Sequence, residues 1–220
     1  GDERPDDYAW MRDRDDPAVV AHLEAENAYA DLALAPAAPT RDAIVAEIAA
    51  RIPDVVDGAP ERKGPWEYFS RTFATRPYAE HRRRPVGDPG EGTVILDEHE
   101  LAEGHEFLSV GAFEVSPDHR LLAYAVDTTG GERYRLRIRD LDTGTDLPDT
   151  LDDTTWGGTA WSADSTHLFY VTPDEQMRPC TVWRHRLGTP QSDDVEVFHE
   201  PDERFYVAVD ISRIDDIEPV

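Results

Sequence analysis

The sequence predicts a mainly β protein: a partial β-propeller of about three to four blades that follows a two-helix N-terminal segment. Three observations predict this fold class. Residues 1–60 show helical periodicity, residues 61–220 consist of short β-rich runs between turn residues, and part of the second region repeats after 46 residues. We therefore expect two domains, a helical segment at 1–60 and an incomplete propeller at 61–220.

The helical segment is expected to hold two helices. Asp16 supplies an acceptor side chain at an N-cap and Pro17 suits the first helical position, after which apolar residues recur at helical spacing up to Pro36. Thr40 is expected to open a second helix, which Pro53 ends. One stripe of it holds Ile44, Ile48 and Ile52. Because such faces are apolar, we expect both helices to dock on another surface.

The repeat decides which β architecture is expected. The pairs that share the 46-residue offset are Ser116 and Ser162, Asp118 and Asp164, Tyr124 and Tyr170, Leu141 and Leu187, and Thr143 and Thr189. Repeats of roughly 40 to 50 residues with four strands each are typical of propeller blades. The blades are expected at about 66–101, 107–150 and 154–198, with a fourth that begins at ERFYVAVDIS.

The blade count falls short of a closed propeller. Closure needs at least about four blades, and the final residues, DISRIDDIEPV, lack an apolar alternation long enough to finish the fourth. We expect the missing blades to come from a longer protein or from another chain.

The charge balance is strongly acidic. There are 47 Asp and Glu residues against 22 Lys and Arg, a formal net charge of -25. Such a chain repels phosphate backbones, so nucleic-acid binding is not expected. Two explanations stay open: a halophilic surface suited to a high-salt cytoplasm, where screening removes self-repulsion, and an acidic cavity that steers cationic peptides.

Cellular location is also predicted from the sequence. The single cysteine, Cys180, excludes an internal disulfide and is expected to be a packing residue. The acidic N-terminus lacks the apolar core of a signal peptide, and no apolar run approaches the ~18 residues of a membrane span. We expect a cytoplasmic protein without a membrane partner.

Catalytic chemistry is not expected in this chain. No serine lies in a GxSxG elbow; Ser109 comes nearest, but Phe107 occupies the first glycine position. Ser116 and Ser162 are better explained as turn residues. The eight histidines show no HExxH pair and no Cys/His spacing, so no metal site and no cofactor are predicted.

Several long phrases resemble one peptidase family. DDYAWMRDRDDPAVVAHLEAENAY, GAFEVSPD, AYAVDTTGGERYRLRIRDL and DERFYVAV are similar, in this order, to the N-terminal half of oligopeptidase B sequences in the prolyl oligopeptidase family. The resemblance implies a seven-bladed propeller that caps an α/β-hydrolase domain, with the N-terminal helices packed on the hydrolase. It also implies a Ser, Asp, His triad that cleaves short peptides after Lys or Arg. That hydrolase domain, the expected partner, is not in this sequence.

Three charged residues form a candidate interdomain latch. Glu132 and Arg178 are 46 residues apart, so with Arg133 they are expected in equivalent loops on one propeller face. If that face meets the hydrolase, ion pairs could hold open or closed forms. The alternative is a solvated loop or a local salt bridge worth about 0 to 1 kcal/mol.

The predicted function is therefore gating: the chain restricts access of short cationic peptides to a hydrolase domain. Alone it is expected to be inactive. The alternative is a non-catalytic, propeller-like protein-binding module that another chain completes.

Overall fold

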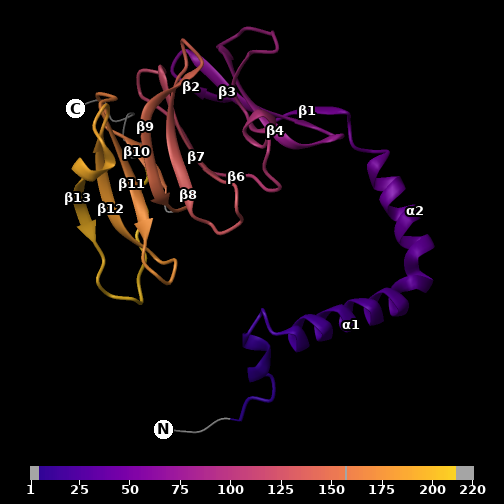
Figure 1. Ribbon diagram of the computed structural model, residues 1–220. Helices are drawn as coiled ribbons and strands as arrows, with labels where there is room; N and C mark the ends of the chain where they lie inside the picture. Colours follow the sequence, from indigo (N-terminus) through magenta and orange to yellow (C-terminus); the bar gives the residue numbers. More distant parts are fainter. Residues whose placement is uncertain (1–4, 157, 212–220) are drawn as a thin grey trace. The chain divides into compact units, whose positions relative to one another are not determined.

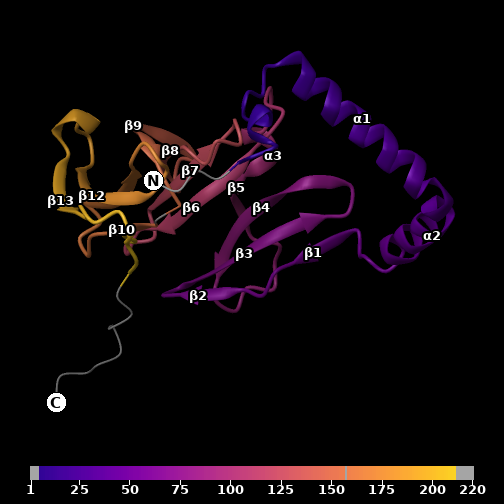
Figure 2. The same cartoon turned by 90° about the horizontal axis from the view of Figure 1, so that it is seen from below.

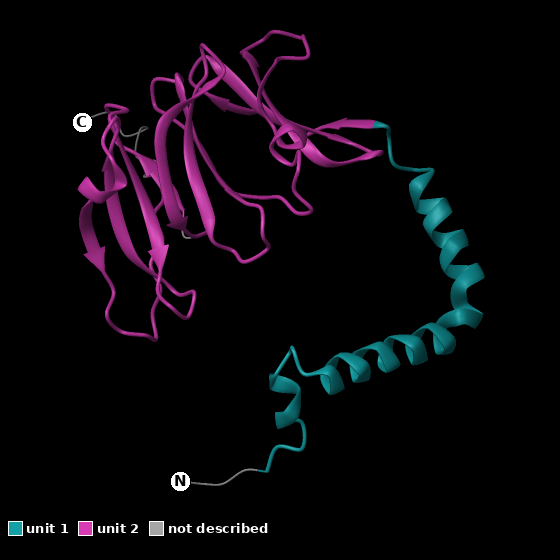
Figure 3. Ribbon diagram, viewed as in Figure 1, with its two compact units in different colours: residues 1–54 teal, residues 55–220 magenta. Residues whose placement is uncertain are grey.

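The computed structural model describes residues 5–156 and 158–211. The chain divides into two compact units, 1–54 and 55–220, which Figure 3 shows in teal and magenta. The second unit begins ahead of the expected boundary at residue 60. The reason is that Val55–Asp57 already forms a strand, which pairs with the strand that starts at Trp66.

The first unit contains the two expected helices. Its elements are η1 (Ala9–Arg12), α1 (Pro17–Leu34), η2 (Ala35–Ala37) and α2 (Ala38–Ala49). The Asp16 carboxylate accepts a hydrogen bond of 2.8 Å from the Ala18 N–H, which confirms the predicted cap. The second helix starts at Ala38 rather than Thr40, because Ala37 and Ala38 already have helical backbone angles and Pro39 lies in the first turn, where its missing N–H is not needed.

The first unit has almost no core of its own. Val19 is the one buried residue of α1, and α2 has none. Seven large apolar side chains on the two helices are at least half exposed. They are Leu23, Tyr29, Leu32, Leu34, Ile44, Val45 and Ile48. The helices therefore owe their form to local signals rather than to packing.

The second unit opens with a five-stranded antiparallel sheet. Its strands are β1 (Val55–Asp57), β2 (Glu61–Lys63), β3 (Trp66–Phe73), β4 (Arg76–Pro85) and β5 (Thr93–Asp97), followed by α3 (Glu98–Leu101). The short strands β1 and β2 both pair with β3, and β3, β4 and β5 follow in order (Figure 2). This first blade is therefore larger than the 66–101 expected from sequence.

Two four-stranded antiparallel sheets follow (Figure 1). The second sheet is β6 (Ser109–Val115), β7 (Leu121–Asp127), β8 (Tyr134–Asp140) and β9 (Thr145–Thr154). The third is β10 (Thr159–Trp161), β11 (His167–Pro173), β12 (Pro179–Arg186) and β13 (Val195–His199), with η3 (Gln191–Asp193) before β13. Each of these two sheets pairs its strands in chain order, as propeller blades do, which confirms the partial propeller.

The predicted turn serines cap the first hairpin of each repeat. Ser116 Oγ donates to Asp118 Oδ1 at 2.6 Å and accepts from the Leu121 N–H at 2.9 Å. Ser162 Oγ donates to Asp164 Oδ1 at the same distance and accepts from the His167 N–H at 2.9 Å. The 46-residue repeat thus reflects one turn structure built twice.

Two apolar clusters join neighbouring sheets. One lies between the first and second sheets and includes Leu96 and Leu122. The other lies between the second and third sheets and includes Leu136, Leu168 and Tyr170. All five side chains are at most 1% exposed. Side chains that alternate along each strand therefore pack one blade on the next.

The segment after β13 has no strand up to residue 211. Residues 203–211, part of the expected fourth blade, follow the third sheet, where the Val207 N–H donates to Pro179 O at 3.0 Å. The final residues of that expectation, 212–220, lie outside the described residues. Within the described part of the chain, no helix has the length and apolar character to cross a membrane.

Candidate functional site

The three candidate latch residues lie in equivalent turns of the second and third sheets. Glu132 and Arg133 are in the turn between β7 and β8, and Arg178 is in the turn between β11 and β12. The structure therefore places them as the repeat predicts. Their side chains, however, have very different surroundings.

A buried aspartate builds the turn between β7 and β8. Asp127, 2% exposed, accepts hydrogen bonds from the Thr129 N–H at 2.7 Å, the Thr129 hydroxyl at 2.8 Å, the Gly130 N–H at 3.1 Å and the Glu132 N–H at 2.8 Å. Burial raises the pKa of Asp127, but these hydrogen bonds outweigh it and hold the pKa below its usual range. The carboxylate thus holds Glu132 at a positive φ of 56°.

Glu132 presents a free charge, whereas Arg133 does not. The Glu132 side chain is exposed and has no hydrogen bond or ion pair to any of the described residues. Arg133 directly precedes β8, and its Nη1 pairs with Oδ1 of Asp153, which lies on β9 of the same sheet. Arg133 is therefore used to join the last two strands of its own blade.

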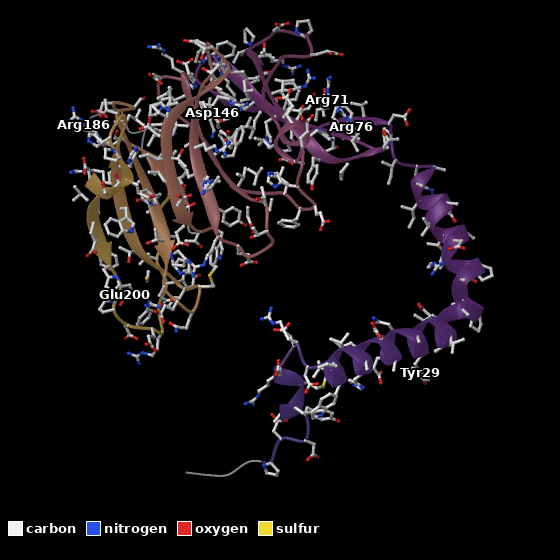
Figure 4. All side chains as sticks on the ribbon, viewed as in Figure 1. Tyr29, Arg71, Arg76, Asp146, Arg186 and Glu200 are labelled. Atoms are coloured by element: carbon white, nitrogen blue, oxygen red, sulfur yellow. The ribbon has the colours of Figure 1, made fainter. Side chains whose placement is uncertain are left out.

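Arg178 is committed to local contacts. Its Nε donates to Asp174 Oδ2 at 2.9 Å, and its Nη1 donates to the carbonyl oxygens of Phe205 at 2.7 Å, Asp202 at 3.2 Å and Glu200 at 3.3 Å. The Asp174 carboxylate accepts hydrogen bonds from the backbone N–H and from the side chain of Arg178. These hydrogen bonds, the backbone one most strongly, hold the pKa of Asp174 below its usual range. Figure 4 labels Glu200 on this part of the third sheet. Arg178 thus fastens the segment that follows β13.

Three consecutive arginines of β4, residues 82–84, also make local contacts. Arg82 Nη2 donates to Glu80 Oε2 at 2.5 Å, and Arg84 Nε donates to Glu67 Oε2 at 2.8 Å. Arg83 Nη1 donates to His119 O at 2.6 Å and so joins the first sheet to the second. Arg82 and Arg84 are therefore paired with carboxylates of their own sheet.

A hollow of about 340 Å³ lies along the first strands of the second and third sheets. Glu114 of β6 and Thr159 of β10 line it, and the Glu114 Oε2 and Thr159 Oγ1 atoms are buried without a hydrogen-bond partner among the described residues. Burial raises the pKa of Glu114, and nearby Lys63 lowers it by less. The sequence does not predict this hollow, because no spacing of residues along the chain signals a buried side-chain oxygen that lacks a hydrogen-bond partner.

The serine and histidine side chains do not form a nucleophilic site in the part of the chain that the structure describes. No hydrogen bond joins a serine hydroxyl to a histidine ring in residues 5–156 and 158–211. Over the same residues, no group of three or more His, Cys, Asp or Glu side chains could hold a metal ion. Cys180 is buried, and its Sγ is 3.9 Å from Thr172 O, as suits a packing residue.

Comparison with known proteins identifies the class of this fold. Residues 1–216 match the family model described as "Prolyl oligopeptidase, N-terminal beta-propeller domain". The chain belongs to this family.

Two curated relatives in this comparison are named as peptidases. Dipeptidyl aminopeptidase BI from Pseudoxanthomonas mexicana is 39% identical over 98% of this chain and 32% of its own length. Protease 2 from Moraxella lacunata is 34% identical over 97% of this chain and 32% of its own length. The chain therefore spans about a third of the curated relatives that it matches.

Two solved structures are similar in fold to this chain. Oligopeptidase B from Leishmania major superposes with a TM-score of 0.81 and 36% identity, covering 90% of this chain and 29% of that one. Oligopeptidase B from Trypanosoma brucei with covalently bound antipain, in a closed form, gives a TM-score of 0.79 and 35% identity over 90% of this chain and 28% of that one. The chain is thus similar to one section of these larger peptidases.

Proposed function

We propose that this chain is the propeller portion of an oligopeptidase B-like serine peptidase and that it gates short peptides to a hydrolase domain. The family match over residues 1–216, on a chain that spans about a third of its peptidase relatives, carries this proposal. The hydrolase domain would supply the triad, since no serine of this chain lies in a nucleophile elbow. The working location would be the cytoplasm.

The acidity of the chain supports cationic peptides as substrates. A net charge of -25 attracts positively charged peptides and raises their encounter rate, most strongly at low salt. We extend the proposal to cleavage after Lys or Arg. The test is a set of pentapeptides that differ only at the cleaved residue, offered to the complete peptidase that carries this chain.

The expected order in that test is Arg and Lys far above Pro and Ala in kcat/KM. Equal rates for Arg and Pro peptides would contradict the basic specificity while leaving the gating proposal standing. Raising the salt concentration should lower kcat/KM for the Arg peptide and leave it nearly unchanged for a neutral peptide.

Of the three latch candidates, Glu132 is the one whose side chain has no partner among the described residues. Its exposed carboxylate is free to pair with a cation of the hydrolase domain, whereas Arg133 and Arg178 are committed within the propeller. Glu132→Lys in the complete peptidase should therefore change the rate of peptide cleavage and its salt dependence. Glu196→Lys, on exposed strand β13, makes the same change of net charge and is the matched control.

Equal kinetics for Glu132→Lys, Glu196→Lys and the parent enzyme at low and high salt would remove the latch. A change shared by both variants would show a general charge effect instead.

A further inference from the structure

The second and third sheets each contain a tyrosine, an aspartate and a cationic side chain in one hydrogen-bonded group. In the second sheet, Tyr124 OH donates to Asp146 Oδ2 at 2.6 Å, and Arg139 Nε donates to Asp146 Oδ1 at 2.8 Å. Figure 4 labels Asp146. Asp146 thus accepts hydrogen bonds from a tyrosine hydroxyl and from an arginine, whose side chain stays positively charged.

The third sheet repeats the group with a different cation. Tyr170 OH donates to Asp194 Oδ2 at 2.8 Å, and His185 Nδ1 is 2.7 Å from Asp194 Oδ1. Tyr170 and His185 follow Tyr124 and Arg139 by the same 46 residues as the rest of the repeat. A titratable histidine therefore occupies the position that arginine occupies one blade earlier.

In both sheets this side chain also reaches the last strand of the preceding sheet. Arg139 Nη1 donates to Ile95 O on β5 at 3.5 Å. His185 Nε2 is 3.0 Å from Asp149 Oδ1 on β9, and the same oxygen accepts from the Gly188 N–H at 2.5 Å. The group is therefore a joint between neighbouring blades as well as a contact within one.

The joint at His185 is closed to solvent. His185 is 0% exposed, and the side chains of Asp149 and Asp194 are 2% and 1% exposed. The titratable groups around the ring are Asp149 from β9, Asp194 ahead of β13 and, one hydrogen bond further, Tyr170 from β11. Gln191 adds a neutral donor to the Tyr170 hydroxyl at 3.3 Å.

Two ionised carboxylates at these distances would each take a donor from the one ring. A neutral imidazole carries a single N–H, so its other nitrogen would turn a lone pair toward a buried carboxylate. Only the imidazolium form donates to Asp149 and Asp194 together, and it also balances part of their charge. The contacts of Arg139 do not depend on protonation in this way, because a guanidinium keeps its proton.

We infer that His185 makes the joint between the second and third blades depend on a bound proton. The joint holds while the ring is an imidazolium and weakens when alkaline pH removes the proton. The preceding joint, through Arg139, does not respond to pH in this range. A hollow of about 350 Å³ lined by Asp149 and Gly188 lies beside the group.

The direct test is the protonation of the ring in the full 220-residue chain. Long-range ¹H–¹⁵N correlation spectra distinguish a ring with two N–H groups from a neutral tautomer. At pH 8 the expected result is two protonated nitrogens for His185 and one for exposed His105, with signals assigned through His185→Gln and His105→Gln. A neutral His185 ring at pH 7 would overturn the inference.

Variants test the consequence for stability. The unfolded chain lacks the joint, so the folding constant should fall by at most about tenfold per pH unit over the range in which the folded joint still holds a proton that the unfolded chain has released. His185→Arg should reduce this slope by one proton, and His105→Gln should leave it unchanged. Equal slopes for wild type and His185→Arg would overturn the inference; if His185→Arg does not fold, the nitrogen spectra of the wild-type chain decide.

Discussion

The helical unit and the β unit of this protein obtain their structure in different ways. The helices at 5–54 are specified by local signals, such as the Asp16 cap, and bury little besides Val19. The sheets at 55–211 bury two apolar clusters and link neighbouring blades by hydrogen bonds. The difference lies in packing: the β unit buries apolar side chains between its sheets, whereas the helical unit leaves most of its large apolar side chains exposed.

The largest expected effect comes from the core between the second and third sheets. Leu136→Ala removes a fully buried side chain from that cluster and should lower the free energy of unfolding by about 2 to 5 kcal/mol. The matched variant in the helical unit is Leu32→Ala, at a position that is 77% exposed. It should change stability by less than about 0.5 kcal/mol. Urea denaturation followed by tryptophan fluorescence measures both, and equal effects would contradict the comparison.

A smaller effect is expected from the turn that presents Glu132. Asp127→Asn replaces the carboxylate, one oxygen of which accepts from the Glu132 N–H, with an amide. The substitution should lower the free energy of unfolding by about 1 to 3 kcal/mol. Because the folded pKa of Asp127 is lowered, its contribution is present above the unfolded value of about 3.9 and is lost as pH falls through the folded value. Acid titration followed by circular dichroism should therefore show a weaker loss of stability for the variant. An unchanged acid limb would show that Asp127 does not couple to folding.

The smallest effect is expected at the helix cap. Asp16→Ala removes the acceptor of the Ala18 N–H and should destabilise α1 by about 1 kcal/mol. Helix content measured by far-ultraviolet circular dichroism should fall, while the fluorescence transition of the sheets stays in place. Asp15→Ala, at a neighbouring exposed carboxylate, is the control. A shift of the sheet transition by Asp16→Ala alone would show that the units are coupled.

Much of the fold could be predicted because it rests on repeated local chemistry. Ser116 and Ser162 have the same turn chemistry at the same offset, and the apolar alternation of each blade is visible in the chain. The strand Val55–Asp57 was missed because three residues carry too little pattern to signal a strand.

The candidate site could be predicted only as positions. The repeat placed Glu132 and Arg178 in equivalent turns, but the partners of Arg178 are backbone carbonyl oxygens, which no side-chain pattern reveals. The role of His185 could not be predicted, for a similar reason. Its role depends on burial beside Asp149, which is 36 residues away in the sequence and lies in another blade.

The central claim, that this chain gates a peptidase by size, is tested most directly with substrates of increasing length. The measurement is kcat/KM of the complete peptidase for peptides of one core sequence with a single Arg, extended stepwise by flexible residues, and for a folded protein that displays the same core on a surface loop. The account predicts rapid cleavage of the short peptides, a steep decline with length and no cleavage of the folded protein. Equal kcat/KM across the series and for the folded protein would contradict it.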